Sequence, residues 1–339
     1  MPTNTEAQVT PERIMQMAWG YAPPLILEAA LHHRVFDVLD GGPKTIRELE
    51  AATGASGRGL TAIMNALVGL NLLSKNEAGK YALTPESAAF LVSTKPGFSG
   101  GMIRHCSQHL IPKWLRLTEI VATGKPATAV NQEQQGAAFF QNFVEDIFNM
   151  SYAPAKHLAS TLNLNNANGP VRVLDLAAGS GVWGIALAQQ SEQVRITAVD
   201  WPDVIPVTRK IVGRFGLSDR FHFVEGDLHS ADFGANHQVA TLGHILHSEG
   251  EQLGRALLRK TFDALAPGGQ IVIAEFLVND ARTEPPLGLL FAVNMLVNTE
   301  NGGTYSANEI NGWLQEAGFT NQRTLEAHGP SPLILATKP

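Results

Sequence analysis

The hydrophobic pattern of the chain changes most sharply between residues 171 and 189. Apolar residues dominate 171–176, small residues fill 177–181, and apolar positions then recur at helical spacing. This order predicts a buried strand, a tight turn and a helix, a unit that often binds nucleotides. Gly179 and Gly181 can adopt positive φ, which lets a ligand lie against the backbone of the turn.

The C-terminal half repeats this alternation of apolar strands and amphipathic helices. Strands are predicted at 171–176, 195–199, 221–225, 238–243, 270–276, about 321–326 and 332–337. Such alternation is typical of an α/β fold with a doubly wound, mostly parallel sheet whose ligands bind at the carboxyl ends of the strands. The strand at 332–337 is expected to be antiparallel and to form the edge of the sheet.

The N-terminal third has a mainly helical pattern with a strongly apolar stripe between residues 10 and 40. The stripe consists of Ile14, Met17, Tyr21, Pro24, Leu25, Leu27 and Leu31. This is more apolar surface than a helical segment should show to water, so it predicts the interface of a homodimer. Thr45 and Glu48 have the spacing of a capping box at the start of a short helix, and a second helix is expected at 60–70. Two short strands at 72–75 and 80–83 complete a winged-helix-like pattern.

These patterns predict three regions. Residues 1–100 form a winged-helix-like dimerisation domain, 101–165 a helical linker and substrate lid, and 166–339 the ligand-binding domain. Within the second region, 123–135 is rich in Gly, Pro, Thr, Asn and Gln and is the best linker candidate.

Composition limits the kinds of partner that the protein can bind and the cell compartment in which it is expected. The 339 residues carry a net charge of −6 and a single cysteine, Cys106, which excludes an internal disulfide and fits a reducing cytoplasm. The N-terminus lacks the features of a signal peptide, and no 18-residue apolar run predicts a membrane span. A winged-helix DNA-binding regulator is the alternative from another class, but its recognition helix, 58–70, offers only Arg58 as a cation, so no nucleic-acid partner is expected.

The turn at 179–184 spells G-x-G-x-x-G, which fits a dinucleotide as well as other cofactors. Asp175 lies inside the preceding strand, where a carboxylate would repel a phosphate and attract a cation. S-adenosylmethionine (SAM) is such a cation. A second acid, Asp200, ends the next strand and suits a ribose diol, and Asp227 follows the third strand.

These motifs, together with the segment 265–269 before the fifth strand, resemble in order and spacing the SAM-dependent methyltransferase fold. That resemblance implies a Rossmann-like class I domain with a seven-stranded sheet whose last strand is antiparallel. It also implies a cofactor site, which we assign to Asp175, Gly179, Gly181, Asp200, Trp201, Gly226, Asp227 and His244.

Near the carboxyl ends of the fourth and fifth strands lie two residues that suit proton transfer. His247 has an unperturbed pKa suited to a general base at neutral pH, and Glu275, 28 residues later, could orient its imidazole. His244, three residues earlier, is the competing candidate for the base.

The arrangement resembles the small-molecule O-methyltransferases typified by the plant caffeic acid and flavonoid enzymes and their bacterial natural-product relatives. In that family the histidine of an L-H-D-W segment is the base, and His247 matches it. The chain departs from the family pattern at four positions. Ser248 replaces an aspartate, Gly243 a lysine of the plant enzymes, Ala177 a common glycine, and Thr304 a second supporting acid. Glu300 is the predicted replacement for that acid.

The resemblance implies methyl transfer from SAM to a hydroxyl of a small, aromatic or polyketide-like acceptor. N- or C-methylation and a non-methylating use of the sulfonium remain open alternatives within the same fold. His105 and His109 lie one helical turn apart, but no third ligand is near them in the sequence. We therefore expect no metal site.

Overall fold

The computed structural model describes residues 9–130, 136, 140, 143–166, 169–327 and 331–339. The chain divides into two compact units, Met1–Leu110 and Ile111–Pro339. The predicted domain boundaries after residues 100 and 165 stay predictions. Residues 131–135 of the predicted linker lie outside the described part of the chain. No helix in the described part of the chain is both long and apolar enough to cross a membrane.

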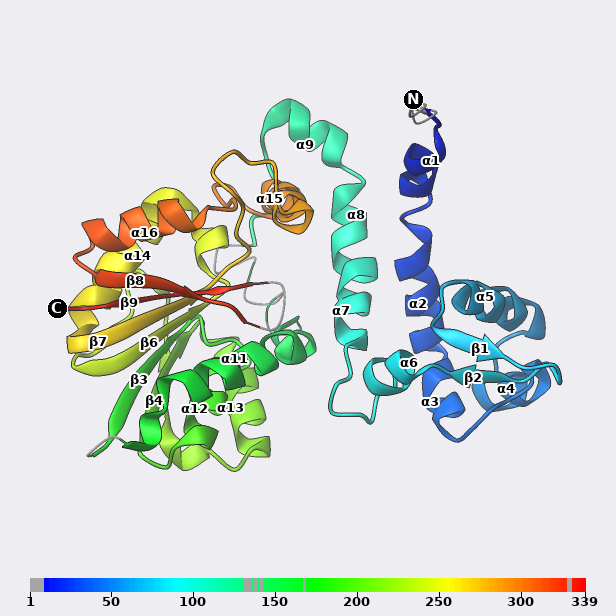
Figure 1. Ribbon diagram of the computed structural model, residues 1–339, viewed down its shortest axis with the longest axis horizontal. Coiled ribbons are helices and arrows are strands. Elements are labelled where there is room, and N and C mark those ends of the chain that lie inside the picture. The colour runs from blue at the N-terminus through cyan, green and yellow to red at the C-terminus, as the bar shows by residue number, and fades with distance from the viewer. Residues whose placement is uncertain (1–8, 131–135, 137–139, 141–142, 167–168, 328–330) are drawn as a thin grey trace, which may run out of the picture. The chain divides into compact units, whose positions relative to one another are not determined.

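The first unit is built from short helices and one two-stranded sheet (Figure 1). Its elements are α1 (Glu12–Ala18), α2 (Ala22–His32), α3 (Val35–Asp40), α4 (Ile46–Thr53), α5 (Gly57–Gly69), β1 (Leu73–Lys75), β2 (Tyr81–Leu83), α6 (Pro85–Phe90), α7 (Gly100–His105) and the π-helical turn η1 (Cys106–Leu110).

Local sequence explains where several of these helices begin. Thr45 and Glu48 form the predicted capping box at the start of α4, with the Glu48 backbone N–H donating to the Thr45 hydroxyl at 3.3 Å. β1 and β2 pair antiparallel as the predicted wing. The apolar stripe divides: Leu27 and Leu31 pack against the core of this unit, whereas Ile14, Met17, Tyr21 and Leu25 stay exposed.

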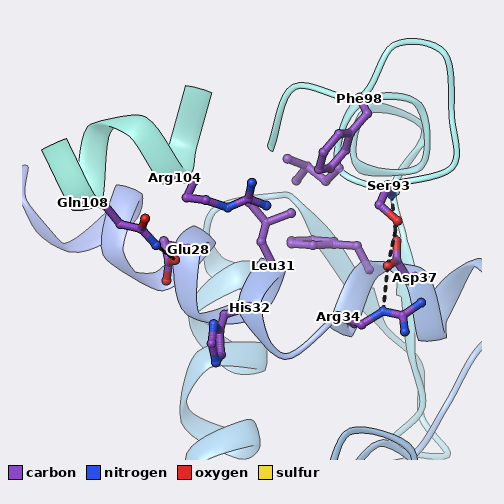
Figure 2. A pocket seen from close by; sticks show the side chains of 11 residues that line it. Glu28, Leu31, His32, Arg34, Asp37, Ser93, Phe98, Arg104 and Gln108 are labelled. Atoms are coloured by element: carbon purple, nitrogen blue, oxygen red, sulfur yellow. Dashed lines mark hydrogen bonds and ion pairs between the residues drawn. The ribbon is translucent and has the colours of Figure 1, made fainter. Parts of the chain in front are cut away.

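Figure 2 shows a pocket of about 310 Å³ inside this unit. Asp37 of α3 accepts hydrogen bonds from the Ser93 backbone N–H at 2.7 Å and the Ser93 hydroxyl at 2.9 Å. Arg34 donates to the same carboxylate at 3.3 Å. These contacts fix the segment after α6 against α3.

The second unit alternates helices and strands around one sheet. Its elements are α8 (Ile111–Trp114), α9 (Leu117–Thr123), α11 (Phe148–Leu162), η2 (Leu164–Asn166), β3 (Val171–Leu176), α12 (Val182–Gln190), β4 (Val194–Asp200), α13 (Ile205–Arg214), η3 (Ser218–Arg220), β5 (Phe221–Glu225), β6 (His237–Gly243), α14 (Leu246–Ala264), β7 (Leu265–Ala274), α15 (Pro286–Asn298), α16 (Ala307–Glu316), β8 (Thr320–Leu325) and β9 (Leu333–Thr337).

The seven strands lie in the order β5-β4-β3-β6-β7-β9-β8, which confirms the predicted α/β class and the antiparallel last strand. The prediction that this last strand forms the edge was wrong. β9 lies between β7 and β8 and is antiparallel to both, so β8 is the edge. β9 is apolar and buried at four consecutive residues, 333–336, which explains why it lies inside the sheet. β8 is mostly exposed, as suits an edge strand.

Side chains of the strands alternate between two apolar clusters. Val171 and Val173 pack with α11, α12 and α13, whereas Leu174 and Leu176 pack with α14 and α16 on the other face. The sheet is therefore covered on both sides, and its loops at the carboxyl ends remain available for ligands.

The close packing of α12 on the sheet depends on Gly184, the last glycine of the G-x-G-x-x-G sequence. A Cβ there would lie 3.0 Å from a carboxylate oxygen of Asp175, 3.0 Å from Ile196 and 3.1 Å from Phe221. All three are buried, so the helix would have to move away.

We expect Gly184→Ala to lower the free energy of unfolding by about 1–3 kcal/mol through overpacking. Gly312, on α16, is the matched control because a Cβ there meets no atom within 4 Å. Gly312→Ala should raise the free energy of unfolding by about 0.5–1 kcal/mol through helix propensity. Urea denaturation of both variants tests the contrast, and equal shifts would contradict it.

Candidate active site

The loop between β3 and α12 turns through three left-handed residues. Ala177, Gly179 and Gly181 have φ of 49°, 53° and 73°. Such a turn exposes backbone atoms to a ligand, and it is easy for glycine but strained for alanine. The strain at Ala177 explains why a glycine is common at this position in the family that the sequence resembles.

Asp175 is fully buried just before this loop. One carboxylate oxygen accepts from the Thr241 hydroxyl at 2.7 Å, and the other from the Gly184 backbone N–H at 3.1 Å. Burial raises the pKa of Asp175 to about 7, although both hydrogen bonds oppose the shift. With no exposed surface, the side chain holds β3, β6 and α12 together, and its predicted role towards the cofactor stays a prediction.

Asp200, at the end of β4, binds the same loop. Its carboxylate accepts from the backbone N–H groups of Gly179 and Trp201, both at 2.7 Å. Burial raises its pKa to about 6, against the effect of these two bonds. The indole N–H of Trp201 in turn lies 3.4 Å from Asp227, so four of the predicted cofactor residues, Gly179, Asp200, Trp201 and Asp227, are linked by hydrogen bonds.

The loop after β5 is also tied to α14. Asp227 accepts from the His229 backbone N–H at 2.8 Å, and the His229 Nε2 lies 2.6 Å from Glu249. Burial raises the pKa of Glu249, and the hydrogen bond with His229 lowers it by less. This pair joins the segment after Gly226 to the first turns of the helix that carries His247.

His247 and Glu275 meet as predicted, from the start of α14 and the end of β7. The His247 Nδ1 lies 2.8 Å from one Glu275 carboxylate oxygen, and the His247 backbone N–H donates to the other at 3.2 Å. Burial would raise the pKa of Glu275, but the charge and hydrogen bonds of His247 hold it below its usual value. The contact places a proton on Nδ1 and leaves the lone pair of a neutral imidazole on Nε2.

Aromatic rings pack against the imidazole of His247. Phe291 of α15 meets its imidazole edge-on at a centroid distance of 4.9 Å, and Phe276 lies 4.1 Å from Phe291. His244 is 5.2 Å from Phe276, and its Nε2 lies 2.9 Å from the Ser331 hydroxyl. Burial lowers the pKa of His244 to about 4, so this imidazole holds a proton weakly.

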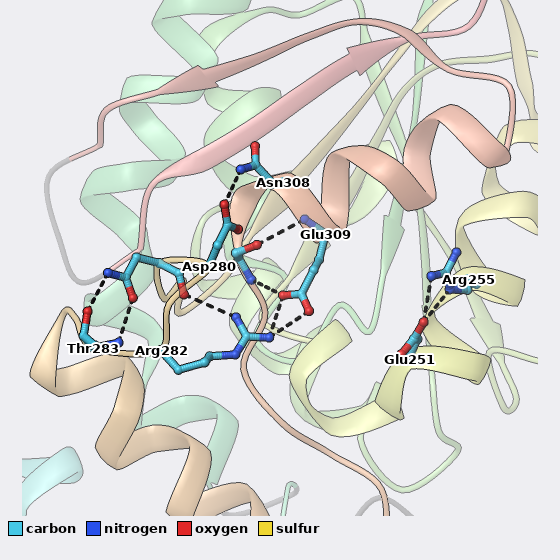
Figure 3. Close-up of polar contacts among 9 residues, drawn as sticks. Glu251, Arg255, Asp280, Arg282, Thr283, Asn308 and Glu309 are labelled. Atoms are coloured by element: carbon cyan, nitrogen blue, oxygen red, sulfur yellow. Dashed lines mark hydrogen bonds and ion pairs between the residues drawn. The ribbon is translucent and has the colours of Figure 1, made fainter.

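Two sets of polar contacts fix α15, which carries Phe291. Asn294 and Asn298 of α15 accept from the Trp114 indole N–H and the Lys113 ammonium of α8, both at 3.0 Å. Figure 3 shows the second set, in which Arg282, before α15, donates to both carboxylate oxygens of Glu309 at 2.7 and 2.8 Å. The aromatic wall beside His247 is therefore held from both ends of the helix.

Comparison with known proteins places this geometry in a family. Residues 114–320 match the O-methyltransferase domain, and residues 15–93 match the O-methyltransferase dimerisation domain. The chain belongs to the O-methyltransferase family. This confirms the resemblance inferred from the motifs, and SAM is the methyl donor of the family.

Full-length relatives support the assignment. The 3-hydroxy-5-methyl-1-naphthoate 3-O-methyltransferase of Streptomyces sahachiroi is 30% identical over 94% of this chain and 92% of its own. The tetracenomycin polyketide synthesis 8-O-methyl transferase TcmO of Streptomyces glaucescens is 29% identical over 97% of each chain. A crystal structure of a Nostoc punctiforme protein has a TM-score of 0.89 at 27% identity, covering 98% of this chain and 100% of its own.

The residues of this O-methyltransferase fit SAM. The left-handed loop presents its backbone, and the carboxylates of Asp200 and Asp227 lie at the ends of neighbouring strands, where a ribose diol and an adenine amine would find acceptors. Among the described residues, no group of three or more His, Cys, Asp or Glu is arranged to hold a metal ion. His105 and His109 have ring centroids 5.5 Å apart.

The departures from the family pattern have local explanations. A Cβ on Gly243 would lie 2.0 Å from the Trp183 indole nitrogen, so no lysine fits there while Trp183 keeps its position. Ser248 is buried and donates to the Ile245 carbonyl at 2.9 Å. Thr304 is buried, whereas Glu300 is exposed and has no hydrogen bond within the described part of the chain, so its proposed role stays a prediction.

Sequence reasoning missed the contribution of Gly302 and Gly303. The Gly303 backbone N–H donates to the His247 carbonyl at 2.8 Å. A Cβ on Gly302 would lie 2.4 Å from that carbonyl oxygen and 2.3 Å from the Thr299 hydroxyl. The double glycine was visible in the sequence, but nothing local indicates that it packs against the backbone of His247.

We expect Gly302→Ala to displace the first turn of α14 and to lower kcat by about 10–100-fold, because small misplacements of a catalytic group are costly. Gly303→Ala is the control, since its Cβ would meet only the Tyr305 hydroxyl, at 3.9 Å. Its kcat should change by no more than about twofold if its backbone hydrogen bond persists. Steady-state kinetics decides, and equal kcat values for the two variants would contradict this role of Gly302.

Proposed function

We propose that this O-methyltransferase methylates a hydroxyl of a small aromatic or polyketide-like acceptor, with His247 as general base. The contact that carries the proposal is the 2.8 Å pair between His247 Nδ1 and the buried Glu275. Bound SAM supplies the methyl group already activated on its sulfonium. The protein therefore contributes alignment of the acceptor and removal of its hydroxyl proton.

The pair favours His247 over His244 as the base. Nε2 of His247 takes the acceptor proton, and Glu275 stabilises the resulting imidazolium across Nδ1. His244 is less suited, because burial lowers its pKa to about 4 and its Nε2 already contacts Ser331. We retain the earlier assignment of His244 to the cofactor site as a proposal.

The acceptor class follows from the surroundings of the base. Phe276 and Phe291 present apolar ring surfaces beside His247, which suits a flat aromatic acceptor. The relatives named as naphthoate and tetracenomycin methyltransferases support the same class. A phenol of this kind loses its proton as it attacks, which is the step that a histidine base assists.

We expect His247→Ala to lower kcat by about 10²–10⁴-fold while leaving the dissociation constant for SAM nearly unchanged. The deficit should shrink at high pH, because a phenol with a pKa near 10 then ionises without help. Kinetics against pH with a panel of phenols, with SAM binding by calorimetry, provides the measurement.

His244→Ala is the control for this experiment and should lose much less kcat than His247→Ala at neutral pH. Wild-type kcat in His247→Ala would refute the base assignment. Methylated product must also be analysed, since a methyl group found on nitrogen or carbon would refute O-methylation of the acceptor.

We also propose that the protein is a homodimer with its interface near residues 10–40. The match to a dimerisation domain supports this proposal. So do the large apolar side chains left exposed on the first unit, including Ile14 at 70%, Met17 at 65% and Trp19 at 63%. Surface of this kind is costly to leave in water.

A charge placed in this stripe should separate the subunits. We expect Met17→Asp to shift the protein towards monomer in light scattering after gel filtration, because a carboxylate is costly at an apolar interface. Leu253→Asp, at a 41% exposed position on α14, is the control and should leave the mass unchanged. A monomeric wild-type protein, or an unchanged dimer of Met17→Asp, would contradict the proposed interface.

A further inference from the structure

A second pocket lies in the second unit, at the end of the sheet opposite the cofactor loop. It has a volume of about 560 Å³ and is lined by the first residues of β3, β4, β5 and β6. Because these strands are parallel, their amino ends form one edge, and we call this cavity the amino-edge pocket. The methyl-transfer residues lie at the other edge.

Three arginines line the amino-edge pocket: Arg172, Arg195 and Arg220. Within the described part of the chain, none of them forms an ion pair with a carboxylate. Each is instead held by its Nη1, which donates to backbone carbonyls: Arg172 to Ala235, Arg195 to Glu192 and Val194, and Arg220 to Ala188 and Ser191. The guanidinium groups are thus positioned by the backbone while their Nε and Nη2 atoms have no hydrogen bond to the described residues.

The pairing of the strands places two of these arginines opposite each other in the sheet. Arg172 on β3 and Arg195 on β4 are direct register partners. Like charges at such positions repel each other and destabilise a sheet. A bound anion would reverse this repulsion into attraction, and planar guanidinium groups match the oxygen atoms of phosphate or carboxylate.

A buried histidine adds a second polar feature. His237 is 4% exposed, lines the same pocket, and its Nδ1 has no hydrogen-bond partner among the residues that the structure describes. Its Nε2 lies 2.7 Å from the Phe233 carbonyl and must carry a hydrogen there. Burial lowers the pKa of His237, so the ring is neutral and its buried Nδ1 is a hydrogen-bond acceptor.

Two acids in the lining limit what the pocket can bind. Asp219 and Asp232 are both exposed, and Asp232 accepts from the Gly234 backbone N–H at 2.8 Å. The pocket therefore carries three cations and two anions. A small anion alone could pair with the arginines but would leave the two acids without a partner from the ligand. Hydroxyl groups on the ligand would satisfy these two acids.

We propose that the amino-edge pocket binds a small phosphorylated polyol of the sugar phosphate class. Three guanidinium groups from separate elements call for more than two acceptor oxygens, which favours phosphate over a single carboxylate. The pocket volume exceeds that of inorganic phosphate alone and leaves room for the hydroxyl-bearing part. This site is independent of the proposed methyl transfer.

The test is calorimetric titration of the full-length protein with ribose 5-phosphate, inorganic phosphate and ribose, at constant ionic strength set with chloride. We expect saturable binding of ribose 5-phosphate, weaker binding of phosphate and none of ribose. Arg172→Gln and Arg195→Gln should each weaken ribose 5-phosphate binding by about 10–100-fold, the range for loss of a charge-assisted contact.

Arg259→Gln is the matched control, because Arg259 is an exposed arginine on α14 that pairs with Asp263 outside the pocket. It should keep wild-type affinity. All three variants should keep wild-type methyl transfer, which also shows that they are folded. A melting temperature that ribose 5-phosphate raises in the wild type but not in Arg195→Gln would support the site.

Three results would overturn the proposal. The first is no saturable binding of ribose 5-phosphate to the wild type. The second is that Arg172→Gln and Arg195→Gln, like the control Arg259→Gln, bind ribose 5-phosphate with wild-type affinity. The binding would then come from ionic strength or from a site elsewhere on the protein. The third is equal affinity for ribose 5-phosphate and phosphate, which would leave an anion site without the polyol specificity.

Discussion

The buried carboxyl group of Asp175 is the contact on which the cofactor side of the sheet depends. It joins β3 to Thr241 on β6 and to Gly184 in α12, and so sets where the loop between them can turn. Its folded pKa, about 7, lies above the unfolded value of 3.8. The protonated form therefore favours the fold at low pH, and this contribution is lost as the pH rises through 7.

The catalytic edge combines this loop with the His247–Glu275 pair through the topology of the sheet. β4, β3, β6 and β7 are consecutive parallel strands, so Asp200, His247 and Glu275 lie at one edge of the sheet although they come from distant parts of the chain. The opposite edge carries Arg172 on β3, Arg195 on β4 and Arg220 before β5. A doubly wound sheet thus separates the His247–Glu275 pair from these three arginines, because each strand contributes a different residue at each end.

Local patterns predicted the strands, the turn at Gly179 and Gly181, the capping box at Thr45 and the pairing of His247 with Glu275. Hydrophobic period, turn chemistry and the order of parallel strands are sufficient for these features. The insertion of β9 beside β7, the positive φ of Ala177 and the contact of Gly302 with His247 depend on long-range packing. No local preference of the sequence specifies which backbone lies against a glycine 55 residues away from its partner.

Glu275 is the acid that accepts hydrogen bonds from His247 in the described part of the chain. Glu275 is 2% exposed, and its charge is stabilised by His247 and by the backbone N–H groups of His247 and Phe276. In these surroundings a proton on Nε2 of His247 would turn the hydrogen bond from a neutral imidazole to the Glu275 carboxylate into an ion pair that water screens little. One buried carboxylate can therefore both fix the tautomer of the imidazole and stabilise its charged form. The backbone N–H of Gly303 holds the carbonyl of the same histidine.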